Sequence, residues 1–333
     1  MSAARSARGT SARIGTLGLG PIADYGVRDL VRGAWRLARA DGRSILTALA
    51  PFLLAQMLLA GTVAVNEFRA ASAVIARYGV DPRAVMAVAP GDLPDGAFEL
   101  YRAGLEAGTF PQIGLIIAGL FGTAASIIAV GRALRAIPYG ELIEGGTANA
   151  TARLFVQSLV GLAVFVAVLV LYLLLAFGKA IGVAVDGGSV RAIIDAFNPA
   201  GALALTVVAL IFGAWLAVRV GFAPYITALE GRGPLEGIRD AWRLTAGRTL
   251  AVLAGAWGSS ILWVLLLALP ATALFLATVA ISDALGAAGA FIGAALAQGA
   301  GYVLTLPPLA SILLLYEREI AVSAGAAPRR PSR

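Results

Sequence analysis

The sequence predicts an all-α polytopic membrane protein, with about six transmembrane helices and short amphipathic interfacial helices before spans one, three and five. Three observations carry this prediction: the composition, six apolar stretches and the distribution of arginine. The 333 residues are 59% hydrophobic and 14% charged, with a mean hydropathy of +0.85. Soluble domains are about 45–50% apolar and about 25% charged. A soluble fold could not bury this much apolar surface, so a bilayer must solvate much of it.

Six apolar stretches each reach the roughly 20 residues that a helix needs to cross lipid. They cover residues 44–66, 112–131, 154–178, 201–222, 250–281 and 287–316. Helices are expected because lipid cannot satisfy backbone polar groups, and a β-barrel would instead show short alternating segments. The last two stretches are longer than a span requires. Pro270 and the Pro307-Pro308 pair inside them predict either kinked, tilted helices or helices that project past the lipid.

The basic residues predict that both termini are cytosolic. With the N-terminus inside, 20 of the 26 basic residues lie on the inner side and six on the outer side, as the positive-inside rule requires. We therefore expect a multi-pass protein of the cell membrane, of the bacterial inner-membrane type. The same distribution explains the net charge of +7 as a topogenic and lipid-facing signal. Anionic lipid headgroups at the inner face are the expected partners, and no nucleic-acid partner is expected.

Three regions follow from this layout. Residues 1–23 are rich in Arg, Ser and Gly and contain no acid, which predicts a disordered cytosolic tail; a transit peptide would have a similar composition. Residues 24–320 form the six-helix membrane domain. Residues 321–333 form a basic cytosolic tail.

The predicted outer-face segment, residues 69–110, is the only long stretch between spans. Asp81-Pro82 is typical of a helix start, with a capping acid before a proline at the first helical position. Asp95 is expected to cap a second short helix that ends near Leu105. The two helices are interpreted as a structured connector, and a lid or a partner-binding element is the alternative.

One basic, tryptophan-bearing phrase occurs twice in the chain. Residues 32–37 are R-G-A-W-R-L and residues 239–244 are R-D-A-W-R-L. On a helix, each copy has an apolar face and a basic face, which suits the bilayer interface. Each copy is followed by a turn, Asp41-Gly42-Arg43 or Gly247-Arg248, and then by a span. The predicted interfacial lipid contacts are Arg32, Trp35, Arg36, Arg239, Trp242 and Arg243.

A weaker third copy, residues 147–154, precedes span three. If residues 147–154 are a true third copy, the chain consists of three units, each an interfacial helix, a span, an outer turn and a second span. If they are not, the phrase is a two-copy repeat. A chance match in a chain rich in Ala, Leu and Arg is the remaining alternative.

Residues 219–248, "RVGFAPYITALEGRGPLEGIRDAWRLTAGR", show a distinctive order: a span end, an aromatic-proline turn, an acid, a Gly-Pro turn and the basic Trp helix. This order resembles the cytosolic segment between spans four and five in the six-helix membrane domain of glycerophosphoryl diester phosphodiesterases and related stand-alone bacterial membrane proteins. The matching residues are Glu230, Gly233-Pro234, Arg239, Trp242-Arg243-Leu244 and Gly247, whereas Asp240-Ala241 replaces the usual arginine and serine. The resemblance covers about thirty residues, supported by the six-span layout.

The resemblance implies a membrane domain and no activity of its own. Catalysis in the phosphodiesterase part of the family needs histidines and metal-binding carboxylates, and this chain contains no histidine. We therefore expect no phosphodiesterase activity. The chain also contains no cysteine, which removes thiol catalysis and thiolate metal sites. Without histidine, Ser-His-Asp triads and the usual zinc ligands are excluded as well, so we predict no catalytic residues, no metal site, no cofactor and no enzyme.

Polar residues inside spans are the remaining candidates, because charged and polar groups in lipid are usually retained for a purpose. Gln56, Gln157 and Gln298 are expected to bond between helices or, alternatively, to bind a substrate. Arg219 is expected to snorkel from span four. No acid lies in the middle of a span, which argues against an ion-coupled transporter. Gly289 and Gly293 predict close helix packing, and a homo-oligomer seam is the alternative.

Three functions fit these observations. The first is a non-enzymatic membrane protein that organises or senses the bilayer through its basic Trp helices. The second is a permease or a transporter of lipids or small molecules. The third is an intramembrane enzyme, for which no catalytic set is visible.

Overall fold

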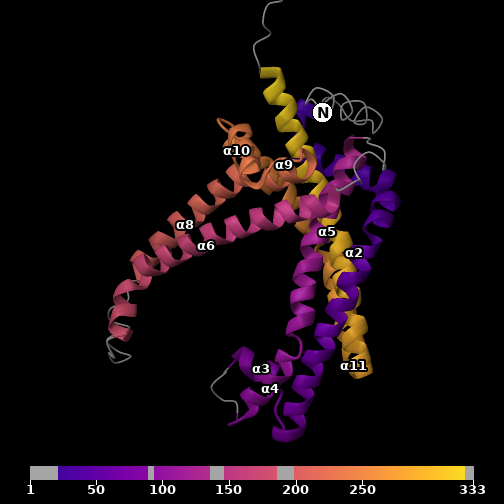
Figure 1. Cartoon of the computed structure of the whole chain (residues 1–333), viewed down its shortest axis with the longest axis vertical. Helices are drawn as coiled ribbons and strands as arrows, with labels where there is room; N and C mark the ends of the chain where they lie inside the picture. The colour runs from indigo at the N-terminus through magenta and orange to yellow at the C-terminus, as the bar shows by residue number, and fades with distance from the viewer. Residues whose placement is uncertain (1–21, 89–93, 136–145, 186–198, 327–333) are drawn as a thin grey trace, which may run out of the picture. The chain divides into compact units, whose positions relative to one another are not determined.

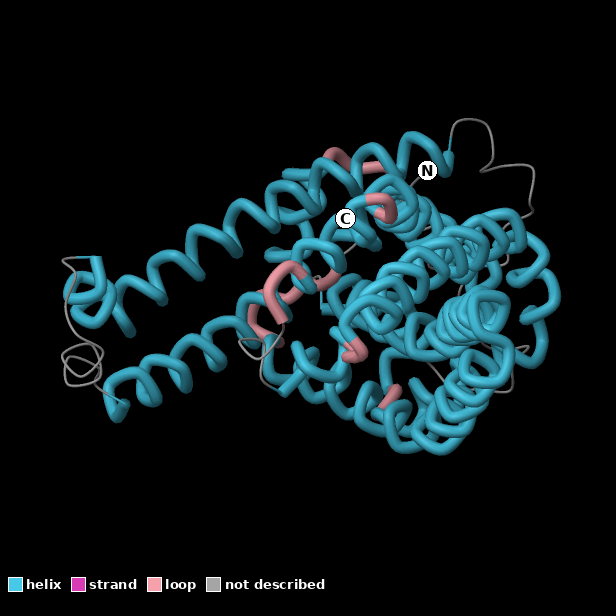
Figure 2. Tube along the Cα trace, turned by 90° about the horizontal axis from the view of Figure 1, so that it is seen from below, coloured by secondary structure: helices cyan, strands magenta, loops and turns pink. Residues whose placement is uncertain are grey.

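The computed structural model describes residues 22–88, 94–135, 146–185 and 199–326. Within these ranges every element is helical (Figure 2), and six helices are long and apolar enough to cross a membrane. The predicted all-α membrane fold is therefore confirmed. The elements are η1 (Ile22–Asp24), α2 (Val27–Tyr78), α3 (Pro82–Val88), α4 (Ala97–Glu106), α5 (Thr109–Arg135), α6 (Gly146–Val185), α8 (Pro199–Val220), α9 (Ala223–Leu229), α10 (Pro234–Leu244) and α11 (Thr249–Ala326).

The chain divides into two compact units. The first comprises Met1–Thr147 and Ala256–Ala321, and the second comprises Ala148–Gly255 and Val322–Arg333. In the first unit, α2, α5 and most of α11 pack together as a helical bundle (Figure 1). In the second unit, α9 and α10 pack on each other, and α10 also packs on α8.

Helix α11 contains spans five and six as an antiparallel hairpin. The backbone leaves the helical region at Gly286, with φ 58° and ψ −131°, a conformation that glycine adopts far more readily than other residues. Trp263, 23 residues before this glycine, donates its indole N–H to Ser311, 25 residues after it, at 2.7 Å. Because these two residues are nearly equidistant from Gly286, the two halves run in opposite directions. The prolines at 270, 307 and 308 lie inside the helical halves, so the reversal depends on the glycine.

The first copy of the repeated phrase lies at the start of α2, without the predicted turn at Asp41-Gly42-Arg43. Helix α2 is continuous from Val27 to Tyr78, and Gly42 has no left-handed φ, whereas Gly247 has φ 75°. This glycine explains the difference between the copies: it provides the turn after α10 that the chain does not make after the first copy. The weaker third copy is likewise the beginning of α6, so only the second copy forms a helix of its own.

The beginning of α2 nevertheless lies at an angle to the rest of that helix. The Leu30 carbonyl accepts a hydrogen bond from Ser311 Oγ at 3.4 Å, and Gln56 Oε1 accepts one from Gln298 at 2.9 Å. Between these contacts α2 advances by 26 residues, whereas α11 covers only 13. Two straight helices lying side by side would advance equally, so α2 bends between Leu30 and Gln56, as can be followed in Figure 1. We call residues 27–43 the N-terminal arm.

The predicted outer segment contains the two expected short helices. Asp81 Oδ1 accepts a hydrogen bond from the Arg83 backbone N–H at 3.0 Å, so Asp81 caps α3 as predicted. The guanidinium of Arg83 holds the pKa of Asp81 below its usual value of 3.8. The start of α4 differs from the prediction: its N-cap is Gly96, with φ 79°, in place of Asp95. Residues 69–78 belong to α2, where Ala70 and Val74 bury themselves against Tyr101 of α4.

Helical structure extends into the inner edge of both predicted tails, residues 1–23 and 321–333. Ile22 is buried and residues 22–24 form η1, so these residues belong to the folded part of the chain. Helix α11 continues to Ala326. The rest of the predicted tails, residues 1–21 and 327–333, lies outside the described residues.

Candidate lipid-facing site on helix α10

Helix α10 is bounded by strong local signals at both ends. Pro234 occupies its first turn, and the Glu236 carboxylate accepts a hydrogen bond from the Gly233 N–H at 3.2 Å. These features fix the start of a helix because the carboxylate pairs a backbone N–H that has no partner within the helix, and the proline ring holds φ near the helical value. Only residues 245–248 separate the end of α10 at Leu244 from Thr249, where α11 and span five begin. A helix held between two spans by such short connections must lie close to the span ends.

The tryptophan of the second copy packs on span four. The Trp242 ring lies edge-on to the Trp215 ring, with centroids 5.2 Å apart. The Arg219 guanidinium carbon lies 4.8 Å from the Trp242 centroid and 5.6 Å from the Trp215 centroid. Arg219 also donates to the Trp242 carbonyl at 3.2 Å, near the C-terminus of α10, where a cation is favourable. Arg219, predicted to snorkel from span four, thus attaches α10 to that span.

The buried face of α10 is fitted to α6 and α9. Gln157 of α6 donates to the Pro234 carbonyl at 3.1 Å, and Arg153 donates to the carbonyl of Gly231. Gly237 has no room for a side chain, since a Cβ there would lie 2.3 Å from Thr227 Oγ1. Gln157, a predicted intramembrane polar residue, therefore helps to position α10.

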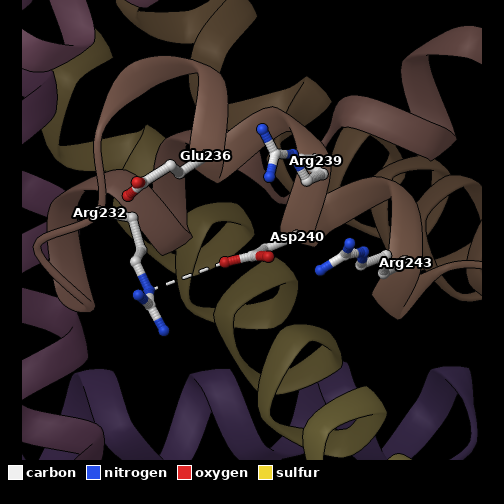
Figure 3. Close-up of a pocket in the computed structure, with 5 residues that line it drawn as sticks. All are labelled: Arg232, Glu236, Arg239, Asp240 and Arg243. Carbon is white, nitrogen blue, oxygen red and sulfur yellow. Dashed lines mark ion pairs between the residues drawn. The ribbon is translucent and has the colours of Figure 1, made fainter.

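The opposite face of α10 carries a charged cavity of about 250 Å³ (Figure 3). The residues that line it are Arg232, Glu236, Arg239, Asp240 and Arg243. Arg232 Nε lies 3.7 Å from Asp240 Oδ2, a loose ion pair. Arg239 and Arg243 are exposed, and neither has an ion-pair partner among the residues that the structure describes. With three guanidinium groups and two carboxylates, the cavity has a formal charge of +1, and two of its cations are available to a ligand.

The first copy repeats this construction on the N-terminal arm. Trp35 is 46% exposed, its ring centroid lies 6.3 Å from that of Trp263, and the Arg39 guanidinium carbon lies 5.1 Å from its centre. Ala34 and Ala241, the alanines before each tryptophan, are both completely buried. Of the predicted contacts, Arg32 is exposed and Arg36 half-buried. In both copies the alanine packs inward, and the tryptophan lies beside a second tryptophan and an arginine.

The two remaining polar candidates lie together inside the first unit. Gln298 donates to Gln56 Oε1 at 2.9 Å, and Gln56 Nε2 donates to the Ala118 carbonyl at 3.2 Å. This chain of bonds joins α11, α2 and α5, which is the interhelical role expected for glutamines in lipid. Nearby, the hydroxyls of Ser126 and Tyr302 lie 2.6 Å apart, and both are within hydrogen-bonding distance of the Gly122 carbonyl. Since each hydroxyl has one proton, one must donate to the other, which in turn donates to Gly122.

Gly289 and Gly293 are both buried. Gly289 lies beside the reversal in α11, where a Cβ would be 2.1 Å from the Ile281 carbonyl oxygen. Close packing between spans five and six of one chain thus accounts for this glycine. The homo-oligomer alternative stays a prediction.

A cluster of buried charges that the sequence did not predict lies at the end of α5 and near the end of α11. Arg135 Nε lies 2.6 Å from Glu317 Oε1, and Arg318 Nη2 lies 2.6 Å from Glu319 Oε1. Arg318 also donates to the Tyr25 carbonyl at 2.9 Å, which fastens the chain just before the arm. Burial raises the pKa of the Tyr25 hydroxyl to about 12. The sequence feature that could have indicated these buried charges is Y-E-R-E-I at residues 316–320, where charged residues follow span six without a Gly or Pro turn.

No known protein family, curated protein or solved structure matches the chain. The resemblance of residues 219–248 to the phosphodiesterase-associated membrane domain therefore stays a prediction. In the described ranges, no group of three or more carboxylates is placed to hold a metal ion.

Proposed function

We propose that this membrane protein with six apolar helices is non-enzymatic and binds anionic lipid headgroups at the inner face of a bacterial cell membrane, through its basic, Trp-bearing helix α10. The observation that carries this proposal is the pair of exposed arginines, Arg239 and Arg243, without ion-pair partners among the described residues. They lie on a helix that Arg219 and Trp242 attach to the end of a span.

The geometry supports lipid as the ligand. Arginine side chains bind phosphate through paired N–H groups, and tryptophan is favoured at the headgroup level. Helix α10 presents both, and its short connections keep it near the membrane boundary. The likeness of residues 219–248 to a phosphodiesterase-associated membrane domain is part of the same proposal, which assigns the described helices to that type of membrane domain.

The packing of α2, α5 and α11 does not favour transport. In α2, α5 and α11, the glutamines expected in a permease site are bonded to each other and to the Ala118 carbonyl. A Cβ at Gly122 would lie 2.3 Å from Gln56 Nε2, so these helices leave no room for a substrate at that point.

The test is mass spectrometry of the lipids that co-purify with the full chain in native-lipid particles. We compare the wild type with Arg239→Gln/Arg243→Gln and with the control Arg69→Gln/Arg77→Gln, which removes the same charge from exposed arginines of α2. Each arginine near an anionic surface contributes about 1 kcal/mol, so loss of two predicts about 30-fold weaker binding of anionic lipid. The control should retain the wild-type lipids. Equal lipid content in all three proteins would contradict the proposal.

The predicted orientation has a separate test. The chain contains no cysteine, so Ala246→Cys and Ala76→Cys each introduce a unique thiol at an exposed position. A membrane-impermeant maleimide applied to intact spheroplasts should label the Cys variant at 76 and leave the variant at 246 unlabelled until the cells are lysed. The reverse pattern would place α10 on the outer face.

A further inference from the structure

The cavity on α10 contains two carboxylates that simple attraction to anionic lipid does not require. Glu236 has a local role, because it caps the helix through the Gly233 N–H. Asp240 has no such role: it lies in the body of the helix, and Arg232, at 3.7 Å, is a loose partner. A carboxylate between arginines weakens the binding of any anion that offers only acceptor oxygens. It strengthens the binding of an anion that also offers a hydrogen-bond donor.

The charge of the site limits the class of ligand. Three guanidinium groups and two carboxylates line the cavity, so a ligand with a single negative charge neutralises it. Arg239 and Arg243 are one helical turn apart and can contact the oxygens of one phosphate group. In Figure 3, Asp240 lies beside Arg243, within the same cavity. A neutral donor satisfies Asp240 without changing the charge balance, and a hydroxyl group is such a donor.

We propose that the α10 cavity binds a singly charged phosphodiester that carries hydroxyl groups, with Arg239 and Arg243 on the phosphate and Asp240 accepting a hydrogen bond from a hydroxyl. This inference rests on the proposed function and names the ligand class of the same site. Asp240 is then the residue that selects among anionic headgroups, and the two arginines supply affinity without selectivity.

The test compares two lipids of equal charge, of which one has hydroxyl groups in its headgroup and the other has none. Phosphatidylglycerol and phosphatidylethanol are both singly charged phosphodiesters, but only phosphatidylglycerol has hydroxyls in its headgroup. The full chain in detergent is titrated with each lipid, with the same acyl chains, and binding is measured by native mass spectrometry. The wild type should prefer phosphatidylglycerol. Asp240→Ala should reduce that preference about tenfold, the size expected when a hydrogen bond to a charged group is lost.

The variants separate failure of the inference from failure of the proposed function. If Arg239→Gln/Arg243→Gln binds both lipids as the wild type does, the proposed function fails. If the arginines matter but Asp240→Ala strengthens both lipids equally, only the inference is overturned, and Asp240 is a surface charge. Equal binding of phosphatidylethanolamine and phosphatidylglycerol also overturns it, since the selected donor is then an ammonium group. Circular dichroism verifies that each variant is folded.

A last arm identifies the source of the ligand. Deacylated phosphatidylglycerol offers the same phosphate and hydroxyls without acyl chains. Displacement of the lipid by this compound at equal concentration supports the proposal with a free phosphodiester as the ligand. No displacement, with the Asp240-dependent preference intact, supports it with a bilayer lipid as the ligand.

Discussion

Replacing Glu317 by Gln should destabilise the protein strongly, because it leaves the Arg135 guanidinium buried without its closest counter-charge. The two side chains are 3% and 5% exposed, and their charged atoms lie 2.6 Å apart. Removing one partner of a buried ion pair costs about 3–5 kcal/mol. The chain offers a matched contrast in Arg102 and Glu106, whose side chains are 69% and 63% exposed and 3.0 Å apart. An exposed pair one helical turn apart contributes only about 0.3–0.5 kcal/mol.

The assay is reversible unfolding in mixed detergent micelles, followed by far-ultraviolet circular dichroism. Glu317→Gln should shift the unfolding equilibrium by about 100-fold or more, and Glu106→Gln by less than about threefold. The double variant Arg135→Met/Glu317→Leu should recover most of the loss, since an apolar pair of similar volume needs no counter-charge. If Glu317→Gln is as stable as Glu106→Gln, water or lipid headgroups solvate the pair, and the argument from burial is refuted.

Three further predictions follow from the packing and the titration of single groups. Gly122→Ala should destabilise the protein by about 1–3 kcal/mol, because its Cβ would lie 2.3 Å from Gln56 Nε2, while Gly119→Ala, with no atom within 4 Å, should be neutral in the same melt. Arg219→Lys keeps the charge but loses the planar contact with two tryptophans, so tryptophan fluorescence should shift to the red; an unchanged spectrum would show that the contact is not formed. The pKa of the Tyr25 hydroxyl is raised to about 12 from 10.0, so the folded state favours the protonated hydroxyl. The stability that depends on this proton is complete below pH 10 and is lost as the pH rises to 12. Tyr25→Phe should remove that part of the alkaline loss of stability, and equal pH profiles for both proteins would contradict it.

The spans could be predicted from the sequence because hydropathy is a local property. Five of the six apolar stretches lie within a helix of the structure, and the stretch 201–222 runs only two residues past the end of α8 at Val220. Asp81 caps α3 as its sequence indicates. The ends of helices were less predictable. Gly42 and Gly247 follow the same phrase, but only Gly247 takes a left-handed φ. Whether a glycine ends a helix depends on where the following chain must go, and the sequence around it does not contain that information.

The positions of the candidate side chains depended on tertiary contacts that the sequence does not reveal. The repeated phrase correctly drew attention to Trp242, but its partners, Trp215 and Arg219, lie on another helix more than twenty residues away. Glu317 and Arg135 are separated by 182 residues, and each alone resembles an ordinary charge at a span end. Pairing of buried charges becomes visible only when the helices that carry them are placed together.

The reversal at Gly286 has a consequence for how the protein enters the membrane. Spans five and six share one hairpin, joined near Gly286 and held by the Trp263–Ser311 hydrogen bond. No sizeable hydrophilic loop separates the two spans. We therefore do not expect one span to insert on its own while the other is still being translocated. We expect the two to leave the insertion channel together as a preformed pair. A reporter fused near Gly286 would therefore disturb insertion itself, and topology reporters for this part of the chain belong outside the hairpin.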